Sequence, residues 1–236
     1  MNLLIDWWTV LVARDAPALP NPTLLRYSLL LSWLPAIGLF GAVLGWKFSW
    51  QMRRALALLF MLGALATAFG PLQSMHWLGL AFQSLSFPAM LLCALALYPV
   101  LAGPDLPIRQ RVPVENRVSI GYLLLAVLPG YVLLLDTFAL LPLQMYAWGF
   151  GRMALFCLLL LGLLPLVLAL ATPKWWVLVP ASLLLFAATR LPTGNVWDAL
   201  LDPWLWLFAN GVLVRDVYRR FVAVNTTLTT KITMEK

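Results

Sequence analysis

Hydrophobic residues are grouped in seven long stretches along the chain, and short polar segments separate them. A helix needs about 20 mainly apolar residues to cross a hydrocarbon core about 30 Å thick. We therefore expect seven membrane-spanning helices, at residues 24–46, 55–70, 77–102, 119–141, 152–172, 175–190 and 198–214. The second, sixth and seventh stretches are short, so we expect them to extend into flanking residues or to lie where the bilayer is thin.

The charges between these stretches predict an orientation. Twelve of the sixteen Lys and Arg residues follow the first, third, fifth and seventh stretches. The other four are Arg14, Arg26, Arg152 and Arg190. Because positively charged loops stay in the cytoplasm, the N-terminus is expected outside and the C-terminus inside. Tryptophans at the predicted ends of the stretches agree, since indole rings favour the membrane interface.

Composition supports a membrane protein. Of the 236 residues, 63% are hydrophobic and 11% are charged, whereas soluble domains have about 45–50% and about 25%. No polar stretch is long enough for a soluble domain. The predicted fold class is therefore all-α, a polytopic membrane helix bundle of about seven transmembrane helices. We place it as a multi-pass protein in the inner (plasma) membrane of a bacterium.

The ends of the chain differ from its middle. We divide it into an interfacial N-terminal segment with a linker (1–23), a transmembrane bundle (24–214) and a basic cytoplasmic tail (215–236). Residues 2–12 are too short to span a membrane. They form either a short interfacial helix that lies on the outer surface or a mobile tail.

The net charge of +7 does not indicate a nucleic-acid partner, because the cations are divided among short loops between apolar stretches. The partners expected are membrane lipids and another membrane protein. The tail could contact anionic headgroups or dock to such a protein.

Six ionisable residues are expected near the outer side of the membrane, where a charge is costly and is therefore a candidate for function. At about 1.5 Å per residue, Asp136, Arg190 and Asp202 lie about 20–26 Å above the inner ends of their spans. Arg152 begins its span at the outer boundary, and Asp198 and His76 lie near the same surface. The six candidates are Asp136, Arg190, Asp202, Arg152, Asp198 and His76.

Two interpretations of this polar layer remain open. In the first, Asp136 or Asp202 forms an ion pair with Arg190 or Arg152, because an unpaired buried charge is unfavourable. In the second, the two arginines bind an anionic headgroup or phosphate from outside.

The remaining candidates also have two interpretations each. Asp198 and Asp202 are four residues apart, so they would share a face of the last helix. They could bind a cation or act as acid and base, or Asp198 could cap that helix while Asp202 forms an ion pair. Pro192 and Gly194 predict a turn just before it. His76 could transfer a proton or anchor the chain at the interface beside Trp77.

The sequence gives no positive sign of catalysis. With one histidine, neither a bis-histidine haem nor a zinc site is expected, so no metal and no cofactor are predicted. Phosphate-binding glycine loops, nucleophile elbows and CxxC pairs are missing. We therefore expect a non-catalytic subunit or accessory of envelope machinery, or a protein of lipid-like substrate handling or transport. A membrane enzyme that acts on a lipid-linked anionic substrate at the outer face is the first alternative, and a seven-helix sensor is the second.

Overall fold

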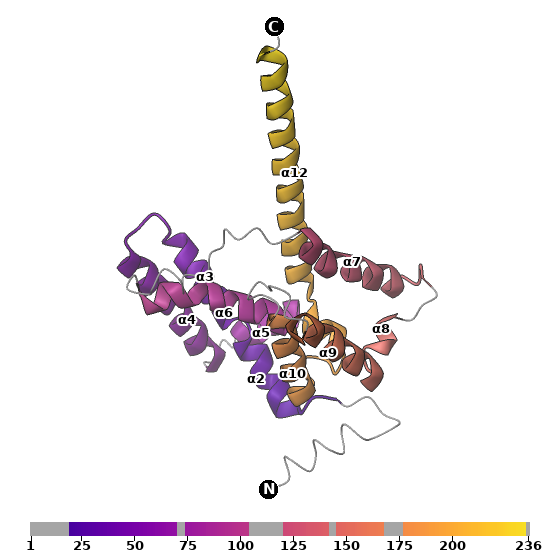
Figure 1. The fold of residues 1–236 in the computed structure, drawn as a ribbon. Coiled ribbons are helices and arrows are strands. Elements are labelled where there is room, and N and C mark those ends of the chain that lie inside the picture. Colours follow the sequence, from indigo (N-terminus) through magenta and orange to yellow (C-terminus); the bar gives the residue numbers. More distant parts are fainter. Residues whose placement is uncertain (1–18, 70–73, 104–119, 142–144, 168–176, 235–236) are drawn as a thin grey trace. The chain divides into compact units, whose positions relative to one another are not determined.

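The structure, a computed structural model, describes residues 19–69, 74–103, 120–141, 145–167 and 177–234 (Figure 1). All regular elements in these ranges are α-helices, which confirms the predicted all-α class. The chain divides into two compact units. The first comprises Met1–Pro113 and Gln144–Asp202, and the second comprises Val114–Leu143 and Pro203–Lys236. The interfacial helix predicted at 2–12 lies outside the described residues.

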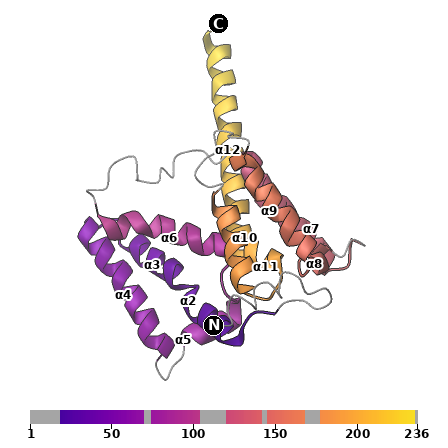
Figure 2. The same cartoon turned by 60° about the horizontal axis from the view of Figure 1, so that its bottom comes forward.

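The described residues of the N-terminal part of the first unit form five helices. They are α2 (Pro22–Leu31), α3 (Leu34–Leu44), α4 (Trp50–Phe69), α5 (Ser74–Phe82) and α6 (Phe87–Ala102). α3 and α4 pack side by side, and α6 lies against α3 (Figure 2). A Cβ at Gly41 would lie 2.8 Å from the carbonyl oxygen of Leu56, so the small residue allows this close contact. Ala42, Ala57 and Leu97 are buried between these helices.

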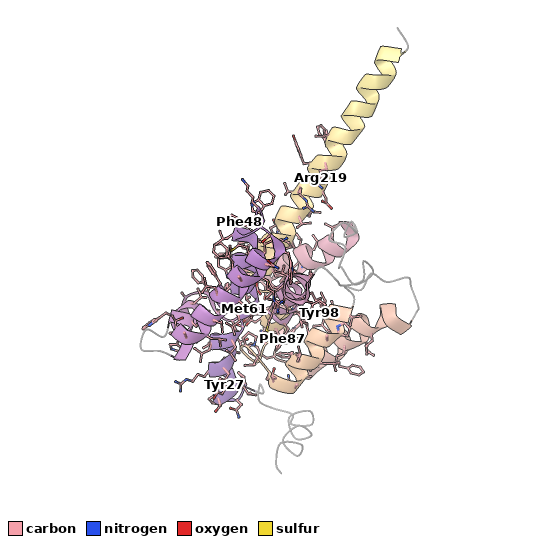
Figure 3. The ribbon with its side chains drawn as sticks, turned by 90° about the vertical axis from the view of Figure 1, so that its left-hand side faces the viewer. Tyr27, Phe48, Met61, Phe87, Tyr98 and Arg219 are labelled. Carbon is pink, nitrogen blue, oxygen red and sulfur yellow. The ribbon has the colours of Figure 1, made fainter. Side chains whose placement is uncertain are left out.

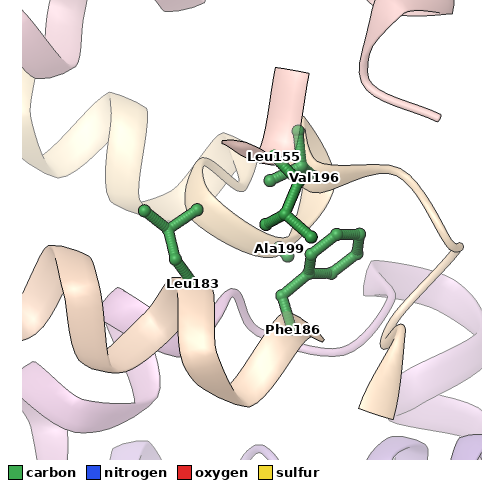
Figure 4. Close-up of a cluster of buried hydrophobic side chains, with 5 residues drawn as sticks. All are labelled: Leu155, Leu183, Phe186, Val196 and Ala199. Carbon is green, nitrogen blue, oxygen red and sulfur yellow. The ribbon is translucent and has the colours of Figure 1, made fainter. Parts of the chain in front are cut away.

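The C-terminal part of the first unit is built on a second cluster of buried side chains. Its helices are α8 (Met145–Trp148), α9 (Arg152–Val167), α10 (Leu178–Thr189) and α11 (Val196–Leu200). The cluster, shown in Figure 4, consists of Leu155, Leu183, Phe186, Val196 and Ala199. It joins α9, α10 and α11, and it supports the segment Arg190–Asp202, which carries three of the six candidate residues.

The second unit contains α7 (Ile120–Thr137) and α12 (Pro203–Met234). Trp206 joins them, because its ring lies edge-on to Tyr131 with 4.8 Å between centroids. Its Nε1 also donates a 3.1 Å hydrogen bond to the carbonyl oxygen of Val127. The hydroxyl of Tyr131 donates to Oδ1 of Asn210 at 3.1 Å. Aromatic packing and two hydrogen bonds therefore hold α7 against α12.

One helical stretch in the described residues is long and apolar enough to cross a membrane. This stretch, Pro22–Leu44, has 23 residues and comprises α2 and α3, and it coincides closely with the first predicted span. Three further apolar helical segments are shorter: Phe87–Ala102, Val127–Thr137 and Leu178–Thr189.

Two predicted spans are interrupted. The span expected at 77–102 is divided into α5 and α6, because Gln83 adopts a left-handed conformation (φ 62°) and Ser86 caps α6, which has a proline in its first turn. The span expected at 198–214 is also wrong in detail. α11 ends at Leu200, Leu201 and Asp202 are extended or irregular, and Pro203 begins α12.

Candidate functional site

The C-terminus of α10 places Arg190 inside the first unit. Arg190 adopts a left-handed conformation (φ 57°), and its N–H donates a 2.7 Å hydrogen bond to the carbonyl oxygen of Phe186. Its guanidinium carbon lies 5.3 Å from the centre of the Phe186 ring. The residue is only 5% exposed. The predicted candidate is therefore a buried cation that packs on an aromatic ring.

A tight loop leads from Arg190 to α11. The Leu191–Pro192 peptide is cis, and Gly194 has a positive φ of 82°. The N–H of Gly194 donates to the carbonyl oxygen of Arg190 at 2.8 Å, and Asn195 then caps α11 by accepting from the N–H of Trp197. The turn predicted from Pro192 and Gly194 is thus present. The capping residue is Asn195, so the prediction that Asp198 caps this helix is wrong.

Asp198 lies in the first turn of α11 and accepts two hydroxyl hydrogen bonds. Thr193 Oγ1 donates to its Oδ2 at 2.5 Å, and Tyr146 Oη donates to the same oxygen at 2.8 Å. Partial burial and then the hydrogen bond to Asp198 raise the pKa of Tyr146 to about 12. Tyr146 therefore keeps its proton at neutral pH and serves as a donor.

Further hydrogen bonds attach α8 to α11. Asn195 Nδ2 donates to the carbonyl oxygen of Tyr146 at 2.9 Å, and Trp197 Nε1 donates to that of Met145 at 2.8 Å. The N–H of Val196 donates to the carbonyl oxygen of Gly149 at 2.9 Å. A Cβ at Gly149 would overlap Oδ1 of Asn195. Only glycine therefore allows this close approach of the two segments.

Asp202 connects the end of α11 to the beginning of α6. Its Oδ2 accepts a 2.6 Å hydrogen bond from the N–H of Ser86, and both residues are buried. The hydroxyl of Ser86 in turn accepts from the N–H of Ala89, which caps α6. Because Asp202 follows the end of α11, it does not share a helix face with Asp198. The prediction that these two carboxylates lie on one face of the last helix is therefore wrong.

The other three candidates are placed elsewhere or are less fully described. Asp136 lies in α7 of the second unit, half-buried. Arg152 begins α9, and its side chain lies outside the described part of the structure. His76 lies in α5, which packs against α2 and α4, and its ring is 6.3 Å from that of Trp77. The contact with Trp77 fits an anchoring role.

Three of the six predicted residues therefore belong to one segment, Arg190–Asp202, within the first unit. We call Arg190, Asp198, Asp202 and their partners Ser86, Tyr146, Thr193 and Asn195 the polar cluster. The described residues contain no group of three or more His, Cys, Asp or Glu side chains that could hold a metal ion. The oxygens of Asp198 and Asp202 accept hydrogen bonds from the protein itself, and that arrangement fixes the backbone around them.

The sequence reasoning missed four members of the polar cluster. Asn195 could have been found, because an Asn just before a short apolar run is a typical N-cap. Thr193 lies in the turn that was predicted. Ser86 and Tyr146 come from distant parts of the chain, and nothing in the local pattern connects them to Asp202 or Asp198.

No family model matches this chain, and no curated protein or solved structure matches it either. The residues of the polar cluster are therefore interpreted from their own geometry and chemistry.

Proposed function

We propose that the chain is a non-catalytic, multi-pass protein of a bacterial inner membrane, with its N-terminus outside and its C-terminus in the cytoplasm. It would act as a subunit or accessory of envelope machinery, or assist the handling or transport of a lipid-like substrate. The observation that carries this proposal is the bonding of the polar cluster. Its carboxylates are engaged by donors of the same unit.

A catalytic or anion-binding site requires side chains that can reach a substrate. Arg190 is 5% exposed and Asp202 is 6% exposed. Asp198 is half-buried, and its Oδ2 accepts from Tyr146 and Thr193. Buried polar groups of this kind usually specify a unique packing arrangement. This bonding supports a structural role of the layer over the enzyme interpretation.

The exposed apolar side chains support a membrane location. In the first unit, Phe40, Leu59 and Leu62 are more than half exposed, and in the second unit Leu128 and Phe208 are also more than half exposed. A soluble monomer seldom has large contiguous apolar patches. Hydrocarbon tails or the apolar faces of other membrane helices would cover these side chains. The short segments between predicted spans leave little soluble surface for a partner, so contacts within the bilayer are favoured.

The proposal is tested on the full-length protein expressed in a bacterium. It should remain in the membrane pellet after an alkaline wash, and it should elute from a sizing column in mild detergent with a second protein in fixed ratio. Asp202→Asn should not change any lipid-linked turnover. A lone monomer that hydrolyses or transfers a lipid-linked phosphate, and loses this activity in Asp202→Asn while still folded, would establish the enzyme alternative instead.

A further inference from the structure

The turn between α3 and α4 combines exposed aromatic rings with cations. Trp46 is 67% exposed and Phe48 is 60% exposed, and Lys47 lies between them. In Figure 3, Phe48, which lies between α3 and α4, and Tyr27 of α2 are at opposite ends of these N-terminal helices. Arg53 and Arg54 follow in the first turns of α4. We call residues 46–54 the α3–α4 turn.

Aromatic contacts hold two of these cations in place. The Nζ of Lys47 lies 5.7 Å from the centre of the Trp46 ring, and the guanidinium carbon of Arg54 lies 5.5 Å from that of Trp50. Trp50 is itself fixed, because its Nε1 donates a 2.8 Å hydrogen bond to the carbonyl oxygen of Val100 in α6. The positive charges are therefore positioned at this end of α3 and α4.

Within the described stretches 19–69 and 74–103, which contain the α3–α4 turn, no carboxylate balances its charge. No Asp or Glu occurs between residues 16 and 104. The first turn of α4 has no acidic residue, although the N-terminus of a helix carries a partial positive charge and favours anions. Two arginines at this position are unfavourable unless an anion lies nearby.

One donor in the turn also lacks an acceptor. The side-chain Nε of Arg53 is buried and has no hydrogen-bond partner among the described residues. Arg53 is held against the turn, since a Cβ at Gly45 would lie 3.1 Å from its Cα. A buried donor without an acceptor costs about 1–3 kcal/mol.

The helices that lead away from the turn have apolar exposed side chains. Phe40 and Val43 of α3 are 56% and 55% exposed, and Leu59 and Leu62 of α4 are 63% and 62% exposed. A free phosphate would contact only the turn. A phospholipid would contact the turn with its headgroup and these side chains with its acyl chains.

We propose that the α3–α4 turn binds the headgroup of an anionic phospholipid. Arg53 and Arg54 donate to the phosphate, Lys47 adds charge, and Trp46 and Phe48 lie at the interface between headgroups and acyl chains. The inference rests on the membrane location in the proposed function, but it does not depend on the accessory role. It assigns a ligand to a loop whose cations were previously explained only by the orientation of the chain in the membrane.

The test uses full-length protein in mild detergent and native mass spectrometry to count bound lipid. Dioleoyl phosphatidylglycerol is compared with dioleoyl phosphatidylcholine, and glycerol 3-phosphate serves as the free-phosphate probe. Each cation near a headgroup contributes about 1 kcal/mol. Arg53→Gln with Arg54→Gln should therefore weaken phosphatidylglycerol binding about 30-fold, and Lys47→Gln alone about fivefold. The matched control for Lys47→Gln is Arg26→Gln in α2, which removes one exposed cation away from the turn and should change the binding less than about twofold.

Three results would overturn the inference. The first is equal binding of the two lipids, and the second is an equal loss in the control variant. The third is competition by glycerol 3-phosphate at lipid-like concentrations, which would identify a free-phosphate site. If the double variant does not fold, Lys47→Gln decides, because this side chain is exposed. Release of the wild-type protein by an alkaline wash would instead contradict the proposed membrane location.

Discussion

The N–H of Ser86 and the Oδ2 of Asp202 are joined by a 2.6 Å hydrogen bond, although 116 residues separate them in the sequence. Ser86 is fully buried and caps the N-terminus of α6, whereas Asp202 follows α11. The bond connects the two sequence-distant parts of the first unit. A carboxylate acceptor makes it stronger than a bond between neutral groups.

Replacing Asp202 should show how much this bond stabilises the fold. Asp202→Ala leaves the buried N–H of Ser86 without an acceptor, so we expect a loss of about 1–3 kcal/mol in the free energy of unfolding. Asp202→Asn keeps an oxygen acceptor and should cost less. Denaturant unfolding in mild detergent measures both. The control Asp216→Ala, which removes the partner of Arg215, should cost less than about 1 kcal/mol. Equal stability of Asp202→Ala and the wild type would contradict this role.

The side chains of Tyr146 and Asp198 should be energetically coupled through their hydrogen bond. Tyr146→Phe removes the donor and leaves Thr193 in place, so a loss of about 0.5–1.5 kcal/mol is expected. A double-mutant cycle with Asp198→Asn separates this bond from other effects and should give a coupling energy of at least about 0.5 kcal/mol. Strictly additive effects would show that the two side chains do not interact in solution.

The raised pKa of Tyr146 predicts a dependence on alkaline pH. Its pKa is about 12 in the fold, because of partial burial and the bond to Asp198, and about 10 in an unfolded chain. The neutral hydroxyl therefore stabilises the native state below about pH 10, and this contribution is lost as the pH rises to about 12. Tyrosinate absorbance, taken as wild type minus Tyr146→Phe, should titrate near pH 12. A midpoint near pH 10 would show that the hydroxyl is free in water.

Gly149 should not tolerate a side chain. A Cβ there would overlap Oδ1 of Asn195 and Cδ1 of Trp197, so Gly149→Ala should lower the free energy of unfolding by about 1–3 kcal/mol. Gly63→Ala in α4 is the matched control. No atom lies within 4 Å of its added Cβ, and alanine favours a helix by up to about 1 kcal/mol. Opposite signs are therefore expected, and two equal losses would contradict the contact between α8 and α11.

The sequence predicted what depends on local pattern. The apolar stretches predicted an all-helical chain, and Pro192 with Gly194 predicted the turn before α11. The breaks at residues 83–86 and at Leu201–Asp202 were missed, because the apolar stretches on either side of each break were joined into one span. Both breaks carry local signals, since Gln83, Ser84 and Ser86 are polar and precede Pro88, and Asp202 is polar and precedes Pro203. The partners of Asp198 and Asp202 were missed for another reason. Tyr146 and Ser86 contact them only through tertiary packing, which the periodicity of the sequence does not indicate.

The membrane topology is the most direct test of the account. Reporters fused after Arg54 and after Lys236 should be active only in the cytoplasm, and one fused after Gln144 should be active only outside. This result would place the polar cluster toward the outer surface and the α3–α4 turn among cytoplasmic headgroups, as the distribution of Lys and Arg predicts. The reverse pattern, or cytoplasmic activity at all three positions, would contradict the orientation on which the proposed function depends.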